Sequence, residues 1–508
     1  MKIKSIALAC VALCAASTSF AGTALDPNAA GTYTTYYMGG ATAQLPGVAI
    51  VVPSTMFDSG TPVTWIYEGT AANPNQAGTV QFPSNPNPAA KGTGNNVMGW
   101  YGVANTTNTG LTGNLLVIYN QNAGSMTGLA QLLNTKGANP TAFPASWTKT
   151  MTVANGASAF TCTLVTPTGG VATNTCYTND AAHQAYFPLN LALSDVYATE
   201  AAPGTIVPGS SNYAALGTLT QTTTGLESFG IAVNPALYLA LQKAQGIVPE
   251  TATAAVLGGA AQPSISRADY ASLISQLGNE NSSAADFIQD PNNTTDNTAI
   301  HIERRTNWSG TQAASDMFFL NAICSTTAGT FLAPLDLGAQ TGTASSATPI
   351  AGNTYLSEQA GTGGVKNAMT FGNAGQVTAG DYAIGIVSLE NTPAQNANSW
   401  QFVKLDGVSP DWINTNGTYT YDTTHRASTI SGAYKFAVEM NAYVLNKQSA
   451  ANAKMDAAIT AALTQSNLHN LTGVSYLDSA TNANYVPAQQ ARYSRYGSNC
   501  SPLVNQNF

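Results

Sequence analysis

Residues 115–134 read LLVIYNQNAGSMTGLAQLLN, and this stretch sets the class of fold. Its first part, Leu115–Tyr119, is apolar without interruption, as is typical of a parallel strand that is covered on both faces. A tight turn with Gly124 and Ser125 follows, and leucines then recur at helical spacing until Gly137. A buried strand that leads through a short turn into an amphipathic helix is the repeating unit of α/β folds.

The same alternation continues along the chain. A second buried strand, Phe229–Val233, is followed by Asn234 as the N-cap of a predicted helix that ends at Gly246. The strand Ala299–Arg305 leads into another helix. Further strands are predicted at Tyr382–Leu389 and Gln401–Leu405, and further helices from Ser266 onward, at Ala433–Leu445 and at Ala450–Leu463. This pattern predicts an α/β protein.

Long stretches rich in Gly, Asn, Thr and Pro separate these elements. They run from Pro53 to Gly113, from Thr135 to Ala185 and from Ala328 to Asn367. Stretches of this length without regular structure are usually functional insertions in a compact domain. We therefore expect an α/β core with decorated loops.

The N-terminus has the pattern of an export signal. Lys2 and Lys4 precede an apolar stretch from Ile6 to Ala16, and small residues lead to Ala21. We expect residues 1–21 to be a signal peptide that is cleaved near Ala21, which places the mature protein in the periplasm or outside the cell. Lipid attachment at one of the two early cysteines, Cys10 or Cys14, is a weaker alternative.

Four cysteines remain after the signal: Cys162, Cys176, Cys324 and Cys500. An even number in an exported chain favours disulfides. We expect Cys162 to pair with Cys176 and staple a local loop, and Cys324 to pair with Cys500 and tie the C-terminus to the body. The spacing alone leaves the connectivity open.

Composition and motifs exclude several classes of function. The net charge of −8 is unlike the basic surface of nonspecific nucleic-acid-binding proteins. The four histidines lack the spacings of zinc enzymes, and neither a G-x-S-x-G nor a G-x-x-x-x-G-K-[ST] motif occurs. We therefore expect no metal, no cofactor and no catalytic residues.

Two strand–turn–helix units are suited to binding a small anion. One turn ends at Ser125, and the other runs from Asn307 to Thr311 directly after Arg304 and Arg305. Free N–H groups and the positive dipole end of a helix attract an oxyanion, and an arginine can hold it with two parallel hydrogen bonds. Each turn taken alone is more often ordinary helix capping.

Five segments, taken in order, resemble the family of periplasmic phosphate-binding proteins that serve ABC transporters. They are Met38–Ala43, Gly124–Gly128, Leu193–Asp195, Arg305–Thr311 and Ala383–Ile386. The most specific parts are Ser-Gly-Thr after an arginine and Ser-Asp at the end of a strand. The resemblance implies a two-lobed clamshell of the type II binding-protein class, in which crossing strands link the lobes and the cleft closes on its ligand.

Carried over to this chain, the resemblance implies eight ligand-binding residues. They are Thr42, Ala43, Ser125, Asp195, Arg305, Ser309, Gly310 and Thr311. Asp195 has a physical role in selectivity, because phosphate near neutral pH keeps a proton that needs an acceptor. Sulfate has no such proton, so an ionised Asp195 would repel it without forming a hydrogen bond.

Three residues depart from the family pattern. Asn307 stands where the family has an acidic partner for the arginine, Trp308 replaces a glycine and Ala43 replaces an aromatic residue. Together with the long insertions, these departures keep an alternative open. In that alternative the chain is an adhesion or interaction protein that retains the fold without binding phosphate.

The resemblance also implies how the chain divides between the lobes. We expect lobe one to contain residues 22–224 and 392–508, and lobe two to contain residues 225–391. The expected ligand is inorganic phosphate or a similar oxyanion, and the expected partner is an ABC transporter permease. We expect a monomer.

Overall fold

The computed structural model describes most of the chain after residue 32. The described residues are 33–61, 63–68, 79–80, 97–120, 124–134, 149–151, 158–165, 171–179, 184–186, 189–198, 200, 219–275, 283–306, 309–322, 324, 332, 334–335, 350, 352–359, 361–369, 380–446, 448–464, 471–477 and 490–505. Strands β2, β3 and β6–β9 are described by their backbone alone. The predicted signal peptide lies outside these residues.

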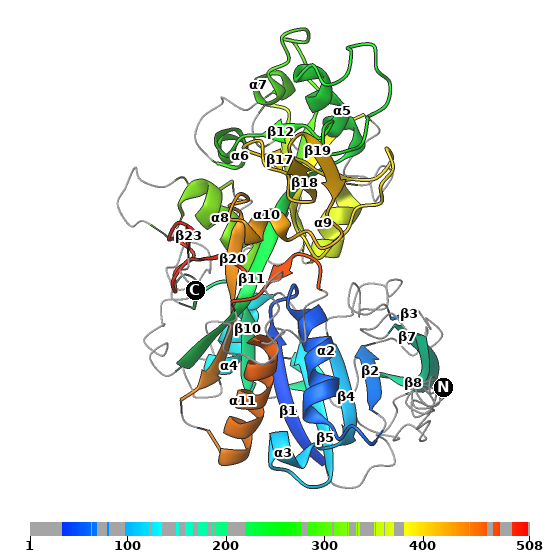
Figure 1. Ribbon diagram of the computed structural model, residues 1–508, viewed down its shortest axis with the longest axis vertical. Helices are drawn as coiled ribbons and strands as arrows, with labels where there is room; N and C mark the ends of the chain where they lie inside the picture. The colour runs from blue at the N-terminus through cyan, green and yellow to red at the C-terminus, as the bar shows by residue number, and fades with distance from the viewer. Residues whose placement is uncertain are drawn as a thin grey trace, which may run out of the picture.

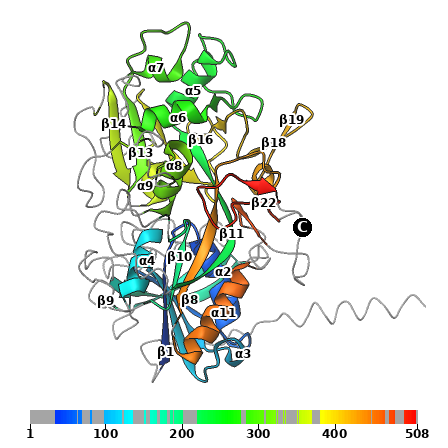
Figure 2. The same ribbon diagram turned by 90° about the vertical axis from the view of Figure 1, so that its left-hand side faces the viewer.

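One twisted sheet of fifteen strands runs through two lobes. Its order is β14-β13-β15-β11-β20-β10-β1-β5-β4-β2-β8-β7-β3, with β16 and β21 also paired to β11. Helices cover both faces of the sheet within each lobe, as Figures 1 and 2 show. The predicted α/β class with two lobes is confirmed.

The lower lobe in Figure 1 is built on parallel strands with helices on both sides. Its central strands are β1 (Tyr33–Gly40), β5 (Asn114–Asn120) and β10 (Leu191–Ser194), and β4 (Val97–Val103) pairs antiparallel with β5. Its helices are α2 (Leu45–Met56), α3 (Thr106–Thr109), α4 (Ser125–Asn134) and α11 (Ala450–Thr464).

Alternate residues of β5 enter two different cores, which explains its continuous apolar run. Leu115 and Val117 pack with residues of α2 and α11, whereas Leu116 and Ile118 pack with residues of α4. Figure 2 shows these helices on opposite faces of the sheet. Burial on both faces accounts for the apolar side chains at every position from Leu115 to Ile118.

The upper lobe repeats this plan with a second parallel unit. Its strands are β13 (Ile300–Arg305), β14 (Thr354–Gln359), β15 (Tyr382–Ser388), β16 (Gln401–Phe402), β12 (Ser264–Ile265), β17 (Lys404–Leu405), β18 (Trp412–Thr415) and β19 (Thr418–Tyr421). Its helices are α5 (Pro235–Ala244), α6 (Arg267–Ile274), α7 (Ala284–Ile288), α8 (Gly310–Leu320), α9 (Thr362–Ala368) and α10 (Ala427–Ile430).

The helix starts of this lobe follow the sequence closely. The side chain of Asn234 accepts a hydrogen bond from the N–H of Leu237 at 3.0 Å and so caps α5. Ser266 and Asp269 form a reciprocal capping box at the start of α6. Gly246, which follows α5, has a left-handed φ of 65°, as a glycine after a helix commonly does.

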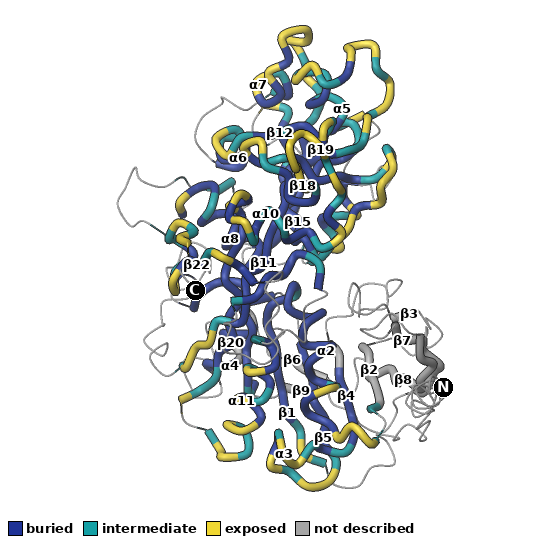
Figure 3. The backbone as a smooth tube through the Cα atoms, viewed as in Figure 1, coloured by how far each residue is buried: buried dark blue, intermediate teal, exposed yellow. Residues whose placement is uncertain are grey.

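Two long antiparallel strands join the lobes. They are β11 (Leu219–Val233) and β20 (Ala437–Leu445), which pair from Leu219↔Leu445 to Ser228↔Ala437. Buried residues continue along both strands through the middle of the molecule (Figure 3). The helix predicted at Ala433–Leu445 is therefore wrong. Its Ala, Glu and Met residues favour helix, but pairing with β10 and β11 on both edges overrides that preference.

The C-terminal segment, residues 490–505, forms a strap across the junction. It carries the short pair β22 (Tyr493–Ser494) and β23 (Val504–Asn505), and β21 (Val474–Ser475) precedes it. Cys500 forms a disulfide with Cys324, which lies beyond the end of α8. This predicted pairing is confirmed, and a disulfide is typical of proteins outside the cytoplasm.

Part of the predicted insertions adds strands to the lower lobe. The strands are β2 (Thr64–Glu68), β3 (Thr79–Val80), β7 (Ser158–Val165) and β8 (Val171–Asn179), and β6 (Lys149–Met151) pairs with β9 (Gln184–Tyr186). The stretch Pro53–Gly113 thus contains β4, which is a full strand of the main sheet, and is not entirely an insertion. The side chains of Cys162 and Cys176 lie outside the described part of the chain.

Two further expectations concern the chain as a whole. The predicted lobe boundary at residue 224 falls within β11, beside a register shift between Thr223 and Gly225. Strands β16–β19 and helix α10, which the prediction puts in lobe one, lie with the upper lobe in Figure 1, and the exact division into lobes stays a prediction. None of the helices in the described residues has the length and apolar character needed to cross a bilayer.

Candidate anion-binding site

Two helix N-termini from different lobes meet at the junction. Helix α4 begins at Ser125 after β5, and helix α8 begins at Gly310 after β13. A Cβ atom placed on Gly310 would lie only 2.3 Å from the Oγ of Ser125 and 2.8 Å from the Oδ2 of Asp195. The start of α8 therefore contacts the lower lobe directly, and this contact requires glycine.

Asp195 lies between these two helix starts, directly after β10. Its Oδ2 accepts a hydrogen bond from the Oγ of Ser125 at 3.1 Å. The backbone N–H of Asp195 donates a hydrogen bond to the same Oγ of Ser125 at 3.2 Å. Asp195 is 2% exposed, and its Oδ1 has no hydrogen-bond partner among the described residues.

Burial raises the pKa of Asp195 to about 7. The hydrogen bond from Ser125 opposes this shift, the charge of Glu390 reinforces it, and Arg305 and Gln44 oppose it. The Asp195 carboxyl can therefore either accept or donate a proton near neutral pH. A group with this property suits a ligand that itself carries an exchangeable proton.

Arg305 ends β13 on the upper-lobe side of the site. Its side chain is fully buried, and its Nη1 donates to the Oγ1 of Thr362 at the start of α9 at 3.2 Å. Burial lowers the pKa of Arg305 to about 10, while Asp195 and Glu390 act in the opposite direction. The guanidinium keeps its charge at neutral pH and supplies the positive charge of the site.

The predicted residues Thr42 and Ala43 lie in the turn between β1 and α2. The carbonyl of Thr42 accepts the N–H of Leu45, and Ala43 is buried. Their neighbour Gln44, which the sequence motifs did not single out, donates from Nε2 to the carbonyl of Ser194 at 2.9 Å. This bond joins the β1–α2 turn to the segment that carries Asp195.

Two glycines allow this part of the lower lobe to pack tightly. Gly40 has φ of +125°, and a Cβ on it would lie 1.9 Å from the carbonyl oxygen of Leu193. A Cβ on Gly128 in α4 would lie 2.5 Å from the Cα of Gly40. The ends of β1 and β10 and the start of α4 therefore converge at the site because side chains are absent there.

The remaining predicted residues line the start of α8. Ser309 is its N-cap and Thr311 its second residue, and both are buried. Seven of the eight predicted residues thus lie on turns or helix starts, and the eighth, Arg305, is the last residue of β13. Asn307 and Trp308 lie outside the described residues. Whether the eight residues bind a ligand stays a prediction.

Two further carboxyl groups near the site were not predicted. Glu227 lies on β11 and is fully buried, and burial, Asp195 and Glu390 raise its pKa well above the usual range. Glu390 follows β15. In a chain with only 8% charged residues, a glutamate within the apolar run of a crossing strand was a signal that could have identified Glu227.

These acidic groups do not form a metal site. Among the described residues, no group of three or more His, Cys, Asp and Glu side chains is arranged to hold a metal ion. The positive charge next to the carboxyl groups comes from Arg305 and Lys366 instead, because Glu390 interacts electrostatically with both.

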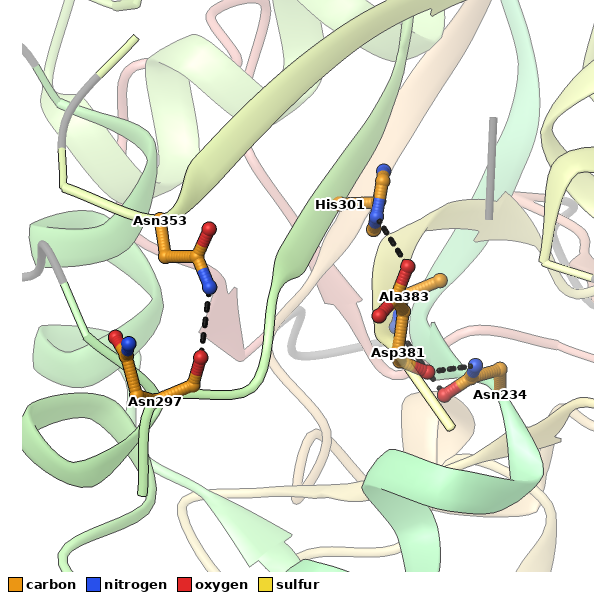
Figure 4. A network of polar contacts seen from close by, with 6 residues as sticks. All are labelled: Asn234, Asn297, His301, Asn353, Asp381 and Ala383. Carbon is orange, nitrogen blue, oxygen red and sulfur yellow. Dashed lines mark hydrogen bonds and ion pairs between the residues drawn. The ribbon is translucent and has the colours of Figure 1, made fainter. Parts of the chain in front are cut away.

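A separate polar network lies at the start of β15 and includes Asn234, His301 and Asp381 (Figure 4). His301 Nε2 lies 3.1 Å from Asp381 Oδ2, and Asn234 donates from Nδ2 to the carbonyl of Asp381 at 2.8 Å. The N–H of Ala383 donates to Asn234 Oδ1 at 3.1 Å. This network ties α5 to β13 and β15, so its role is structural.

No protein-family model and no curated protein matches the sequence. Several solved structures are similar in fold, all at low sequence identity, and they include the following three proteins.

A protein from Clostridium perfringens, assigned as a phosphate ABC transporter substrate-binding protein and solved with bound phosphate, is 9% identical. The match covers 86% of this chain and 98% of that one, with a TM-score of 0.39. An ABC-type phosphate transport receptor from Vibrio cholerae is 11% identical over 54% of this chain and 74% of that one, with a TM-score of 0.26.

An ancestral soluble variant of the human phosphate binding protein is 13% identical, over 64% of this chain and 78% of that one, with a TM-score of 0.30. The solved structures to which this chain is similar thus include the kind of protein that the sequence motifs resemble. At these scores a ligand has to be inferred from the side chains of the site itself.

Proposed function

We propose that this chain is an exported solute-binding protein that captures phosphate or a related oxyanion between its two lobes. The observation that carries the proposal is the contact between the starts of α4 and α8 across the buried carboxyl of Asp195. Helix N-termini supply N–H donors and positive dipole ends to an anion. Arg305 adds a full positive charge beside them.

Closure of the lobes would complete this site. Ser125 and Asp195 belong to the lower-lobe segment, whereas Arg305, Ser309 and Thr311 belong to the upper one. An anion that contacts both sets favours the closed arrangement, because those contacts exist only when the lobes are together. The proposed role is binding and delivery, without catalysis, and the proposed partner is an ABC transporter permease.

Asp195 would provide selectivity for phosphate. Phosphate brings a proton that it can donate to the carboxyl group of Asp195. The hydrogen bond between them therefore forms without any uptake of a proton from solution. Sulfate has no proton near neutral pH, so its binding requires Asp195 to take one up. Because the pKa of Asp195 is about 7, sulfate should bind more weakly than phosphate at higher pH and compete better as the pH falls.

Isothermal titration calorimetry of the ligand-stripped protein with phosphate and with sulfate tests this proposal. We expect phosphate to bind and sulfate to bind much more weakly at pH about 8. Asp195→Asn should lose about 10- to 100-fold in phosphate affinity, because the ligand proton loses its acceptor. Gly310→Ala should also lose binding, because the new methyl group would push Ser125 and Asp195 away.

Gly363→Ala is the matched control for the second substitution. Gly363 lies in the first turn of α9, and a Cβ on it meets no atom within 4 Å. This variant should bind phosphate as the unaltered protein does. Absence of binding with either anion from a folded protein would contradict the proposal and leave the adhesion or interaction scaffold as the function to test.

A further inference from the structure

Glu227 occupies an unusual position for a carboxyl group. It lies on β11 opposite Val438 of β20 and Val474 of β21, and it is 0% exposed. Among the described residues, no donor reaches either of its oxygens. The N–H of Leu389 donates to the carbonyl of Ser228 at 2.9 Å, and this places Glu390 next to Glu227 across the two neighbouring segments, where the two carboxyl groups interact. An isolated buried carboxylate is costly, so this group has to be neutral or closely paired.

Glu390 is held firmly beside it. The hydroxyl of Ser388 donates to its Oε1 at 2.6 Å, and the Nδ2 of Asn391 donates to the same oxygen at 2.8 Å. Gly473 packs against its backbone so closely that a Cβ there would lie 2.6 Å from the N of Glu390. The other oxygen, Oε2, has no donor among the described residues.

The contact between the two glutamates favours a shared proton. Two carboxylates in contact inside a protein repel each other strongly, so one keeps its proton and donates to the other. Burial is the main reason that the pKa of Glu227 is raised, and Asp195 and Glu390 add to it. The titratable groups facing Glu227 are Asp195, Glu390 and Tyr119. Burial therefore favours the protonated form of Glu227, which can donate to the carboxyl of Glu390.

The charge of Glu390 also reaches Arg305. Both Asp195 and Glu390 favour the charged form of that guanidinium. The sequence has Asn307 where the resembled family has an acidic partner for the arginine. In this fold β13 and β15 are neighbouring parallel strands, so a carboxylate just after β15 can serve the arginine at the end of β13.

We propose that Glu390 is the acidic partner of Arg305 and that protonated Glu227 fixes Glu390 in place, so that the pair positions Arg305 for the anion and sets the upper pH limit of binding. This inference rests on the proposed anion site. Glu227 and Glu390 are positioning residues, because they act on the ligand through Arg305.

The sign of the pH effect follows from the charges. While Glu227 keeps its proton, the pair carries one negative charge, which faces the positive charges of Arg305 and Lys366. Loss of that proton adds a second buried negative charge beside Asp195, and this charge repels an anion. Anion affinity should therefore fall as the pH rises through the titration of Glu227.

Calorimetric titration with inorganic phosphate between about pH 6 and about pH 10 tests the proposal. Glu227→Gln keeps the shape and the neutral charge of the protonated side chain. We expect the alkaline loss of affinity to shrink by about 10-fold or more in this variant. Glu390→Gln removes a charge partner of Arg305. We expect this variant to bind phosphate at least about 10-fold more weakly than the unaltered protein at every pH.

Glu303→Gln is the matched control. Glu303 is also a fully buried glutamate, and burial raises its pKa to about 7, but its side chain pairs with Gln359 on β14 instead of the cluster. It should show the alkaline loss of the unaltered protein. The proposal is overturned if Glu227→Gln follows the same profile as Glu303→Gln, or if Glu390→Gln binds as tightly as the unaltered protein.

A second measurement separates this inference from the proposed function. The infrared C=O band of a protonated buried carboxyl should be present at pH about 7 and reduced in Glu227→Gln, with or without phosphate. If the protein binds no phosphate but this difference is seen, the shared proton stands and the anion role is overturned. An identical band in both proteins overturns the carboxyl pair itself.

Discussion

The two buried charge clusters at the junction of the lobes differ in how far the protein itself satisfies them. In the strap cluster, formed by Glu439 and Arg495, Glu439 Oε1 accepts from Ser494 Oγ and from the N–H of Arg495, and its Oε2 accepts from the hydroxyl of Tyr197. Arg495 donates to the carbonyls of Lys435, Ala437, Asn499 and Ser501.

The cleft cluster, formed by Asp195, Glu227, Arg305 and Glu390, is different. Oxygens of all three of its carboxyl groups lack a hydrogen-bond donor among the described residues. A satisfied buried cluster specifies and stabilises a fold, whereas an unsatisfied one stores interactions that a ligand can complete. This contrast fits a structural role for the strap cluster and supports the binding role proposed for the cleft cluster.

The largest expected effect is on the strap. Arg495→Ala should lower the free energy of unfolding by about 3–5 kcal/mol, because buried carbonyls lose their donor and Glu439 loses the positive charge beside it. Chemical denaturation measures this change. Arg492→Ala is the control, since Arg492 is exposed on the same segment and should change stability by less than about 0.5 kcal/mol. A similar small loss in both variants would remove the contrast between the clusters.

A substitution in the cleft cluster should raise the free energy of unfolding, whereas one in the strap cluster lowers it. The pKa of Asp195 is about 7 in the folded protein, above its usual value of 3.8, so its contribution to stability is complete at low pH and is lost as the pH rises through 7. At pH about 8, ligand-free Asp195→Asn should therefore be more stable than the unaltered protein by about 2–4 kcal/mol. If chemical denaturation at that pH shows that Asp195→Asn is less stable than the unaltered protein, the carboxyl group has a structural role.

The smallest effect concerns the network in Figure 4. Burial lowers the pKa of His301, although Asp381 opposes this shift. The folded state thus favours the neutral ring, and stability should fall as the pH drops below about 6.5. In His301→Gln, the loss of stability at low pH should be smaller than in the unaltered protein, by up to about 1 kcal/mol. Thermal unfolding of both proteins at several pH values measures this difference. The same pH dependence of stability in both proteins would mean that folding does not change the pKa of His301.

Several local elements were predictable because their causes are local. The capping residues Asn234 and Ser266 satisfy helix N–H groups within three residues, so their pattern is visible in the sequence. The continuous apolar run of β5 reflects burial on both faces. By contrast, β20 was predicted as a helix, since its partners β10 and β11 are distant in sequence.

The candidate site shows the same division. The motifs identified residues on turns and helix starts, such as Ser125 and Gly310, because a tight turn restricts which residues can occupy it. They missed Gln44, Glu227 and Glu390, whose roles depend on contacts between segments that are distant in the sequence; Gln44 and Ser194, for example, lie 150 residues apart. No periodicity or short motif records such a contact.

The sequence by itself determined the alternation of strands and helices, their caps, the low charge and the pair of helix starts suited to an anion, since these depend on neighbouring residues. The tertiary structure alone decided that the two helix starts meet at Asp195 and that Glu390 lies beside Arg305. The physical reason is that burial and the approach of distant charges set the protonation of a carboxyl group, and both arise only when the chain has folded.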